Sequence, residues 1–350
     1  MAGRRFLGRS VRSVGGMLAL GRLVARRDGS RPDPASGDHL GAIRGEPRIV
    51  RGPRASSLYT EWFPPAEEGG PTVILTHGLC LTEAVWHYQK RDLGGGAHGV
   101  VTWDLPGHGH SDRIAPGQLT QEMAIDALAR VVEEYAGPAG VVLAGHSLGG
   151  TVTLGYLARH ADAAREHVLG ALLVSTPLVQ FAHSVAGRWP GAGLEARVLG
   201  KVVRYLVESD MIDRRLARDV GSDTDTLSYR VVRVGFGKNA SPSQVRYIRD
   251  VIASVPPQVR ADAYRAMTAF DARKHLARVE HPVLVVIGEE DRLVDPHESR
   301  RLARALPEAE VLPLDDVGHA PFLEVPGTFN DAVTRFIDGV RRDRPEADSA

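Results

Sequence analysis

The sequence predicts an α/β fold in which a mostly parallel central sheet is covered by helices on both faces. Strand-like and helix-like segments alternate through most of the 350 residues, which is typical of parallel strands joined by crossover helices. Several strand-like segments are near-continuous apolar runs, such as Val283-Leu284-Val285-Val286-Ile287. Such runs suit strands that are buried on both faces.

Eight strands are predicted from short runs rich in β-branched and apolar residues. They cover residues 48–51, 57–63, 72–76, 99–103, 141–145, 169–175, 283–287 and 309–314. Helices are predicted where apolar residues recur at helical spacing. These helices lie near residues 82–92, 119–135, 148–160, 297–305 and 328–341.

The strand pattern stops between about residues 178 and 270, where helical segments with many Arg and Asp residues take over. An insertion at this point, between two core strands, predicts a helical lid. The expected organisation is a basic extension and Gly/Pro-rich linker (1–47), the first part of the core (48–177), the lid (178–270), the second part of the core (271–342) and a tail (343–350).

Composition excludes several classes of protein. Hydrophobic residues make up 43% and charged residues 25% of the chain, which are ordinary globular values. The formal net charge is zero, so no bulk electrostatic field favours a nucleic-acid partner. Cys80 is the only cysteine, which excludes an internal disulfide framework and a multi-cysteine metal site.

Residues 1–31 differ from the rest, because they contain eight arginines and one acidic residue, Asp28. Three interpretations stay open: a basic amphipathic helix on an anionic membrane, an export signal that starts at Arg4-Arg5, or a frayed extension. No stretch approaches the ~18 consecutive apolar residues that a membrane span needs. We favour a cytoplasmic protein with peripheral membrane contact and leave export open.

The segment Gly145-His146-Ser147-Leu148-Gly149 stands where a predicted strand changes into a predicted helix. A free serine is a poor nucleophile and needs a base, an orienting acid and donors for an oxyanion. A sharp strand-to-helix turn lifts the serine Oγ out of the sheet, and flanking glycines relieve crowding in that turn. The pattern therefore predicts that Ser147 is a nucleophile.

Four motifs then occur in a characteristic order. They are LTHGL (75–79), WDLPGHGHS (103–111), GHSLGG (145–150) and the pair GEEDRLV (288–294) with VGHAPFLEVP (317–326). With these motifs, residues 48–342 resemble the α/β-hydrolase superfamily, in its lid-bearing branch with a serine nucleophile. The chain order nucleophile, acid, histidine is the order of that family.

The resemblance implies a catalytic triad of Ser147, Asp291 and His319. His319 would be the base and Asp291 would orient it. The base has rivals in His77, His108, His110 and His146, and the acid has rivals in Glu289, Glu290, Asp295, Asp315 and Asp316.

The family fold also implies an oxyanion hole made by the backbone N–H groups of Leu79 and Leu148. Asp104, with Gly107, Gly109 and Ser111, resembles a structural loop motif in which the aspartate binds loop backbone. We expect Cys80 to be buried packing near the site. Neither a metal nor a cofactor is expected.

A serine at this position argues against the aspartate-nucleophile branches of the family, the epoxide hydrolases and haloalkane dehalogenases. Hydrolysis of a carboxylic ester is the first choice. The same residues would serve thioester or amide hydrolysis, carbon–carbon hydrolysis, cofactor-free perhydrolysis or acyl transfer. GHSLGG with a helical lid also resembles esterases and monoacylglycerol-type lipases, which favours an apolar acyl or lipid-like substrate. A binding protein built on a hydrolase fold is the alternative of another class. The sequence does not indicate an oligomeric state.

Overall fold

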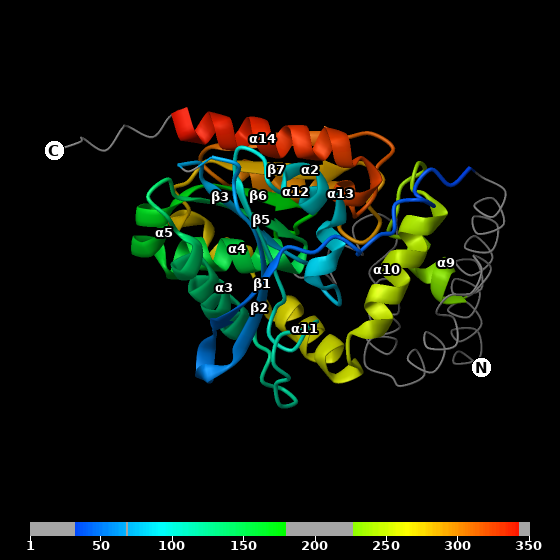
Figure 1. Cartoon of the computed structure of the whole chain (residues 1–350), viewed down its shortest axis with the longest axis horizontal. Coiled ribbons are helices and arrows are strands. Elements are labelled where there is room, and N and C mark those ends of the chain that lie inside the picture. Colours follow the sequence, from blue (N-terminus) through cyan, green and yellow to red (C-terminus); the bar gives the residue numbers. More distant parts are fainter. Residues whose placement is uncertain (1–31, 68, 180–226, 343–350) are drawn as a thin grey trace, which may run out of the picture.

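The computed structural model describes residues 32–67, 69–179 and 227–342. They contain an eight-stranded sheet in the order β1-β2-β4-β3-β5-β6-β7-β8 (Figure 1). The strands are β1 (Glu46–Arg51), β2 (Ser57–Phe63), β3 (Thr72–Thr76), β4 (Gly99–Trp103), β5 (Val141–His146), β6 (Val168–Val174), β7 (Val283–Gly288) and β8 (Ala309–Leu314). The eight predicted strands are confirmed to within two residues at each end.

The sheet is mostly parallel, as predicted. β1 pairs with β2 and β2 with β4 in antiparallel fashion, whereas the strands from β4 to β8 pair in parallel. β7 is buried at every position, which explains its uninterrupted apolar sequence. Parallel strands all end at the same end of a sheet. The loops after β3, β5, β7 and β8 therefore meet there.

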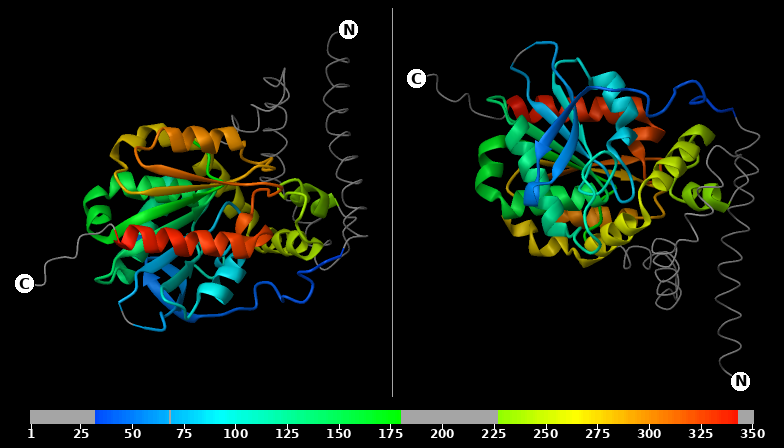
Figure 2. Two further views of the ribbon diagram at one scale, coloured as in Figure 1. Left: turned by 90° about the horizontal axis from the view of Figure 1, so that it is seen from above. Right: turned by 60° about the horizontal axis from the view of Figure 1, so that its bottom comes forward.

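Helices cover both faces of the sheet (Figure 2). One apolar cluster packs α3 (Gln121–Tyr135), α4 (Leu148–Arg159), α11 (Pro257–Ala269) and α12 (Pro296–Arg304) onto the sheet. The other cluster packs α2 (His87–Leu93), α10 (Pro242–Ser254), α13 (Pro321–Glu324) and α14 (Pro326–Arg342). Val285 belongs to the first cluster and Val286 to the second, since successive strand side chains point to opposite faces.

The predicted lid lies partly outside the described residues. Its described part is helical and consists of α9 (Leu227–Arg233), α10 and α11. The chain between α9 and α10 contacts the end of α13, as the N–H of Gly237 donates to Glu324 at 2.7 Å. Figure 1 shows α9 and α10 beyond one end of the sheet.

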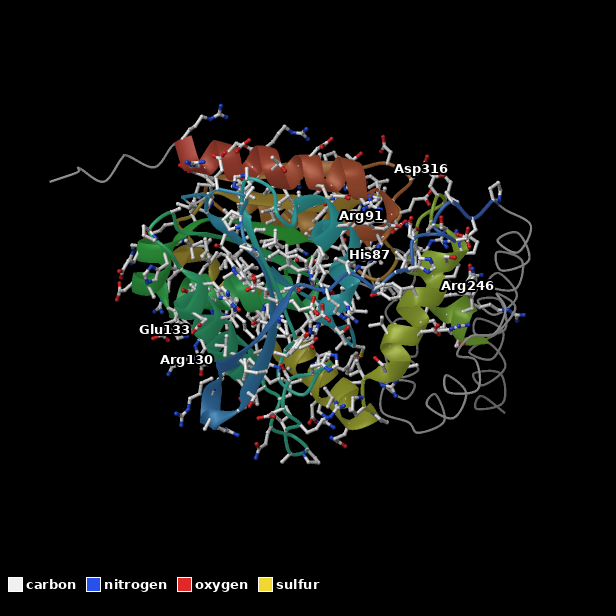
Figure 3. All side chains as sticks on the ribbon, in the orientation of Figure 1. His87, Arg91, Arg130, Glu133, Arg246 and Asp316 are labelled. Atoms are coloured by element: carbon white, nitrogen blue, oxygen red, sulfur yellow. The ribbon has the colours of Figure 1, made fainter. Side chains whose placement is uncertain are left out.

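Residues 32–45, within the predicted linker, connect α10 to the core. Asp33 accepts hydrogen bonds from Ser243 Oγ at 2.7 Å and from Arg246 of α10 at 2.9 Å. Tyr88 of α2 donates to Asp38, and the N–H of Gly41 donates to His87 Nδ1 at 3.2 Å. Figure 3 labels His87 and Arg246, the two sides of this connection.

The same segment ends at a buried charge cluster. Lys90 Nζ lies 2.7 Å from Glu61 and also binds Glu83, and Glu61 accepts a hydrogen bond from the N–H of Gly45. Burial raises the pKa of Glu83 to about 7. A lysine and two carboxylates without water contact need such mutual pairing, so this cluster fixes α2 to β2.

Residues 1–31, to which the membrane and export interpretations apply, lie outside the described part of the chain. Among the residues that the structure does describe, no helix combines the length and the apolar character needed to cross a bilayer.

Candidate active site

Ser147 lies at the junction of β5 and α4, in the sharp turn that the sequence predicted. Its backbone has φ 51° and ψ −110°, a left-handed region that non-glycine residues rarely adopt. The turn is held by a hydrogen bond from the Ser147 N–H to the carbonyl of Val174 at 2.8 Å and by one from the Thr151 N–H to the carbonyl of Ser147 at 3.2 Å. Strain at one residue, supported on both sides, is typical of functional sites.

The glycines on either side of Ser147 are required by close backbone contacts. A Cβ atom on Gly149 would lie 2.7 Å from the carbonyl oxygen of His77. A Cβ on Gly145 would lie 2.6 Å from the nitrogen of Gly150. Because backbone atoms cannot rotate away, a side chain at either position would push the β3 loop or α4 out of place.

Asp291 and His319 form the hydrogen-bonded pair that the family resemblance implied. Asp291 Oδ2 lies 2.7 Å from His319 Nδ1. Asp291 Oδ1 accepts the N–H groups of Leu293 at 2.8 Å and Val294 at 2.9 Å. The aspartate is almost fully buried, so its carboxylate is fixed in direction. This arrangement leaves Nε2 of His319 to exchange a proton with a partner.

The histidine loop adjoins the serine turn through His146. The ring of His146 lies 4.7 Å from the ring of His319, centroid to centroid. His146 Nε2 lies 2.9 Å from the carbonyl oxygen of His319. Burial holds the pKa of His146 well below its ordinary value, so the ring is neutral and Nε2–H donates. The structure thus brings the residue next to Ser147 against the proposed base.

The rival histidines have other roles. His77 and His108 are buried, and burial lowers their pKa values to about 4 and about 3. His77 Nε2 accepts the N–H of Leu105 at 3.0 Å, and His110 packs against Tyr59 with ring centroids 4.8 Å apart. The neutral, buried rings of His77 and His108 therefore support loops, and His110 lies at the surface.

Most of the rival acids bind partners at the protein surface, and Asp315 is exposed. The contacts are Glu289 with Arg300, Glu290 and Asp316 with Lys238, and Asp295 with the N–H of His297 at the start of α12. None of these contacts is with His319, whereas Asp291 makes one.

The two predicted oxyanion donors lie in the two loops that meet at Ser147. Leu148 is the first residue of α4, where helical N–H groups lack an intrahelical acceptor. Leu79 follows Gly78, whose carbonyl lies 2.9 Å from His77 Nδ1 and accepts the N–H of Leu81 at 3.3 Å. The Gly78 carbonyl and the Leu79 N–H belong to one peptide group, so these contacts fix the direction of that N–H.

Two further expectations are confirmed. Asp104 binds loop backbone, because its oxygens accept the N–H groups of Glu83 at 2.9 Å and His110 at 2.8 Å. Cys80 is buried, and burial raises the pKa of its thiol to about 12, so it is an unreactive thiol.

The sequence did not predict the contacts of three supporting residues. They are His77 under the oxyanion loop, His146 between the two loops, and Glu324, which binds the backbone around His319. Each acts through backbone atoms of distant segments. The only available signal was their presence inside the matched motifs.

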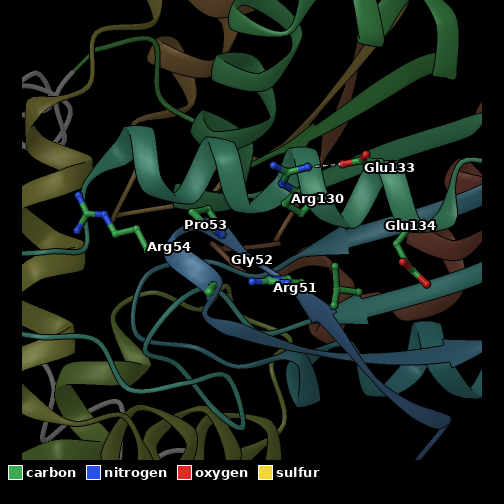
Figure 4. Close-up of a pocket in the computed structure, with 9 residues that line it drawn as sticks. Arg51, Gly52, Pro53, Arg54, Arg130, Glu133 and Glu134 are labelled. Carbon is green, nitrogen blue, oxygen red and sulfur yellow. Dashed lines mark hydrogen bonds and ion pairs between the residues drawn. The ribbon is translucent and has the colours of Figure 1, made fainter.

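A separate depression of about 480 Å³ lies between the β1–β2 turn and α3 (Figure 4). Its wall includes Arg51, Arg54, Arg130 and Glu133, and Arg130 is paired with Glu133 at 2.7 Å. No proposed catalytic residue lines it, so it is not part of the candidate active site.

The profile of the α/β hydrolase fold family matches residues 71–326. This match spans most of the chain. The protein therefore belongs to the α/β-hydrolase fold family, and the resemblance drawn from the four motifs is confirmed.

Similar proteins include enzymes that act on esters. A pimeloyl-[acyl-carrier protein] methyl ester esterase from Neisseria meningitidis is 30% identical over 245 residues, 69% of this chain and 85% of that protein. The AB hydrolase superfamily protein YisY of Bacillus subtilis is 25% identical over 268 residues, 76% of this chain and 91% of that protein. A solved esterase from Thermogutta terrifontis has a TM-score of 0.66 at 24% identity and covers 84% of this chain and 99% of its own. This last similarity shows the shared fold.

Proposed function

We propose that this α/β-hydrolase cleaves carboxylic esters through an acyl-enzyme on Ser147. The observation that carries the proposal is the Asp291–His319 pair, 2.7 Å apart, beside a serine held at φ 51° in a strand-to-helix turn. A buried carboxylate that fixes Nδ1 leaves Nε2 as the proton acceptor for a serine hydroxyl.

The reaction follows from these positions. His319 Nε2 takes the Ser147 proton while Oγ attacks the ester carbonyl carbon. The backbone N–H groups of Leu148 and Leu79 stabilise the oxyanion that develops on the carbonyl oxygen. His319 then gives its proton to the alkoxide, which leaves as an alcohol. Water, deprotonated by His319, attacks the acyl-enzyme, the proton returns to Ser147, and the carboxylic acid is released.

We further propose that the substrate is an ester with an apolar acyl chain. The methyl ester esterases among the relatives support an ester of a small alcohol. Leu79, which packs against the apolar core cluster on the α4 side of the sheet, supports an apolar surface beside the oxyanion loop.

A panel of p-nitrophenyl esters of increasing acyl length, tested with wild type and Ser147→Ala, examines this function. We expect measurable hydrolysis by the wild type and a loss of at least ~10⁴-fold in kcat for the variant, because the nucleophile is removed. A folded wild type that cleaves no ester in the panel would support the binding-protein alternative. Undiminished turnover by Ser147→Ala would show that another residue attacks.

A further inference from the structure

Glu324 lies under the loop that carries His319, at the end of α13. Its side chain is buried. Its carboxylate accepts the N–H of Gly318 at 3.0 Å and the N–H of Ala320 at 3.3 Å. These two amides stand immediately before and after His319, so one carboxylate fixes the backbone on both sides of the proposed base.

The same carboxylate also binds the turn between α9 and α10. The N–H of Gly237 donates to Glu324 Oε2 at 2.7 Å. In the reverse direction, the N–H of His319 donates to the carbonyl of Gly235 at 2.6 Å. The turn and the histidine loop therefore contact each other through backbone atoms, with Glu324 as the shared acceptor.

No side chain separates these two segments. A Cβ atom on Gly318 would lie 2.5 Å from both the carbonyl oxygen of Gly235 and the nitrogen of Gly237. Glycine at this position is thus required by the close approach of two backbones. Segments in such contact cannot move independently, because protein interiors are closely packed.

The turn reaches the loop of Asp291 as well. The N–H of Lys238 donates to Glu290 at 2.9 Å, and Lys238 Nζ pairs with Glu290 and with Asp316. Glu290 precedes Asp291 directly, and Asp316 precedes the Gly318-His319 pair (Figure 3 labels Asp316). Both loops that supply the Asp291–His319 pair are therefore bound to residues 235–238 of the same turn.

We propose that Glu324 is a positioning residue for His319, which it holds in place by clamping the backbone on both sides of it to the turn of the inserted helices. This inference rests on the proposed ester hydrolysis, because it assigns Glu324 a part in the reaction of His319. Glu324 touches neither substrate nor Ser147 and acts only through the loop. A displacement of a catalytic group by about 1 Å can cost ~10²-fold in rate.

Glu324→Gln is the informative variant, since a glutamine has the same shape but one acceptor oxygen and one amide donor. The glutamine oxygen can accept hydrogen bonds either from the N–H groups of Gly318 and Ala320 or from the N–H of Gly237. In each case its NH₂ group faces a backbone N–H that has lost its acceptor. Burial raises the pKa of Glu324 to about 7, so burial disfavours the charged form relative to an uncharged group of the same shape. We therefore expect the variant to fold.

The test measures kcat and KM for a short-chain p-nitrophenyl ester, the rate of fluorophosphonate labelling at Ser147, and the thermal unfolding midpoint. For Glu324→Gln we expect kcat to fall ~10–100-fold, KM to stay within about twofold, and labelling to slow in proportion to kcat. Asp315→Asn is the matched control, because it removes an exposed carboxylate from the same loop that takes no part in the contacts described above. We expect the control to stay within about twofold of wild type in each rate.

A folded Glu324→Gln with wild-type kcat would overturn the inference. If that variant does not fold, Glu324→Asp is the decisive variant, since its shorter carboxylate keeps the charge but reaches fewer amides. A lowered kcat with unchanged KM would support the positioning role of Glu324. A wild-type kcat would overturn it. A wild type that neither cleaves esters nor labels at Ser147 contradicts the proposed function and this inference with it. An active, labelled wild type with an equally active Glu324→Gln contradicts the inference alone.

Discussion

The serine turn and the histidine loop meet at one site but are held in different ways. The serine turn is held by the carbonyl of Val174 and by close packing on the β3 loop, with Gly145 and Gly149 in contact with nearby backbone. The histidine loop is held by Glu324 and by Gly235, the latter 84 positions away from His319 in the sequence. The glycines that the first region requires form a short sequence motif, whereas the contact of the second region with Gly235 has no counterpart in a local motif.

The two regions also differ in the direction in which burial shifts the pKa of their buried supports. The serine turn and oxyanion loop are supported by histidines whose pKa values burial lowers, to about 4 for His77. The histidine loop is supported by a carboxyl group whose pKa burial raises, to about 7 for Glu324. In both regions burial favours the neutral form, which has opposite consequences for stability as the pH changes.

The largest effect should come from breaking the serine turn at Gly149. In Gly149→Ala the new methyl group would lie 2.7 Å from the carbonyl oxygen of His77, so the oxyanion loop must move. We expect kcat to fall at least ~10²-fold, the scale of losing one oxyanion donor, and stability to fall by about 1–3 kcal/mol. Steady-state kinetics and chemical denaturation measure both.

Gly339→Ala is the control for this substitution. Gly339 lies in α14, and an added Cβ would have no heavy atom within 4 Å. This variant should keep the wild-type kcat, and its free energy of unfolding should rise by a few tenths of a kcal/mol or more, because alanine favours the helix. Equal kinetics for Gly149→Ala and wild type would mean that the turn adapts without disturbing the oxyanion loop.

This contrast explains how much of the site the sequence could predict. The serine turn and the eight strands depend on patterns within about ten residues, which the sequence carries directly, whereas the assignment of Asp291 and His319 came from the resemblance of the four motifs to a known family. The clamp by Glu324 depends on where the turn after α9 lies in space, which no local pattern contains. The contacts of Asp33 and Asp38 with α10 and α2 were missed for the same reason.

The next largest effect concerns the pH dependence of stability. His77 binds a proton more weakly in the folded than in the unfolded protein. Its contribution to the free energy of unfolding is therefore lost as the pH falls from about 6.5 towards 4. Glu324 binds a proton more strongly in the folded than in the unfolded protein. Its contribution to the free energy of unfolding is therefore lost as the pH rises from about 4.5 towards 7. Each shift corresponds to at most ~3 kcal/mol, and the two oppose each other in the shared range.

Urea unfolding between pH 4.5 and 7 separates the two contributions. Relative to wild type, His77→Gln should be more stable at the acidic end of this range than at the neutral end, and Glu324→Gln should show the reverse. His297→Gln, at an exposed position of α12, should follow the wild-type curve. Parallel curves for all three variants would contradict the assigned charge states.

The smallest effect should come from shortening the N-terminus. The described contacts of this segment with α10 begin at Asp33, so removal of residues 1–31 should leave short-chain ester turnover within about twofold of wild type. Removal of residues 1–45 also deletes the contacts of Asp33 and Asp38, and it should lower the thermal midpoint by several degrees, a loss of about 1–2 kcal/mol. Identical midpoints for the two truncations would show that residues 32–45 contribute little to stability.

The central claim is that Ser147 is the nucleophile of an esterase, and active-site titration tests it most directly. Wild-type protein is treated with a fluorophosphonate, and residual ester hydrolysis is followed together with intact mass and the modified peptide. We predict one adduct per chain, located on Ser147, with activity lost in proportion to labelling, and no adduct on Ser147→Ala. Full ester hydrolysis by protein that carries no adduct, or an adduct on another residue that accounts for the loss of activity, would contradict the claim.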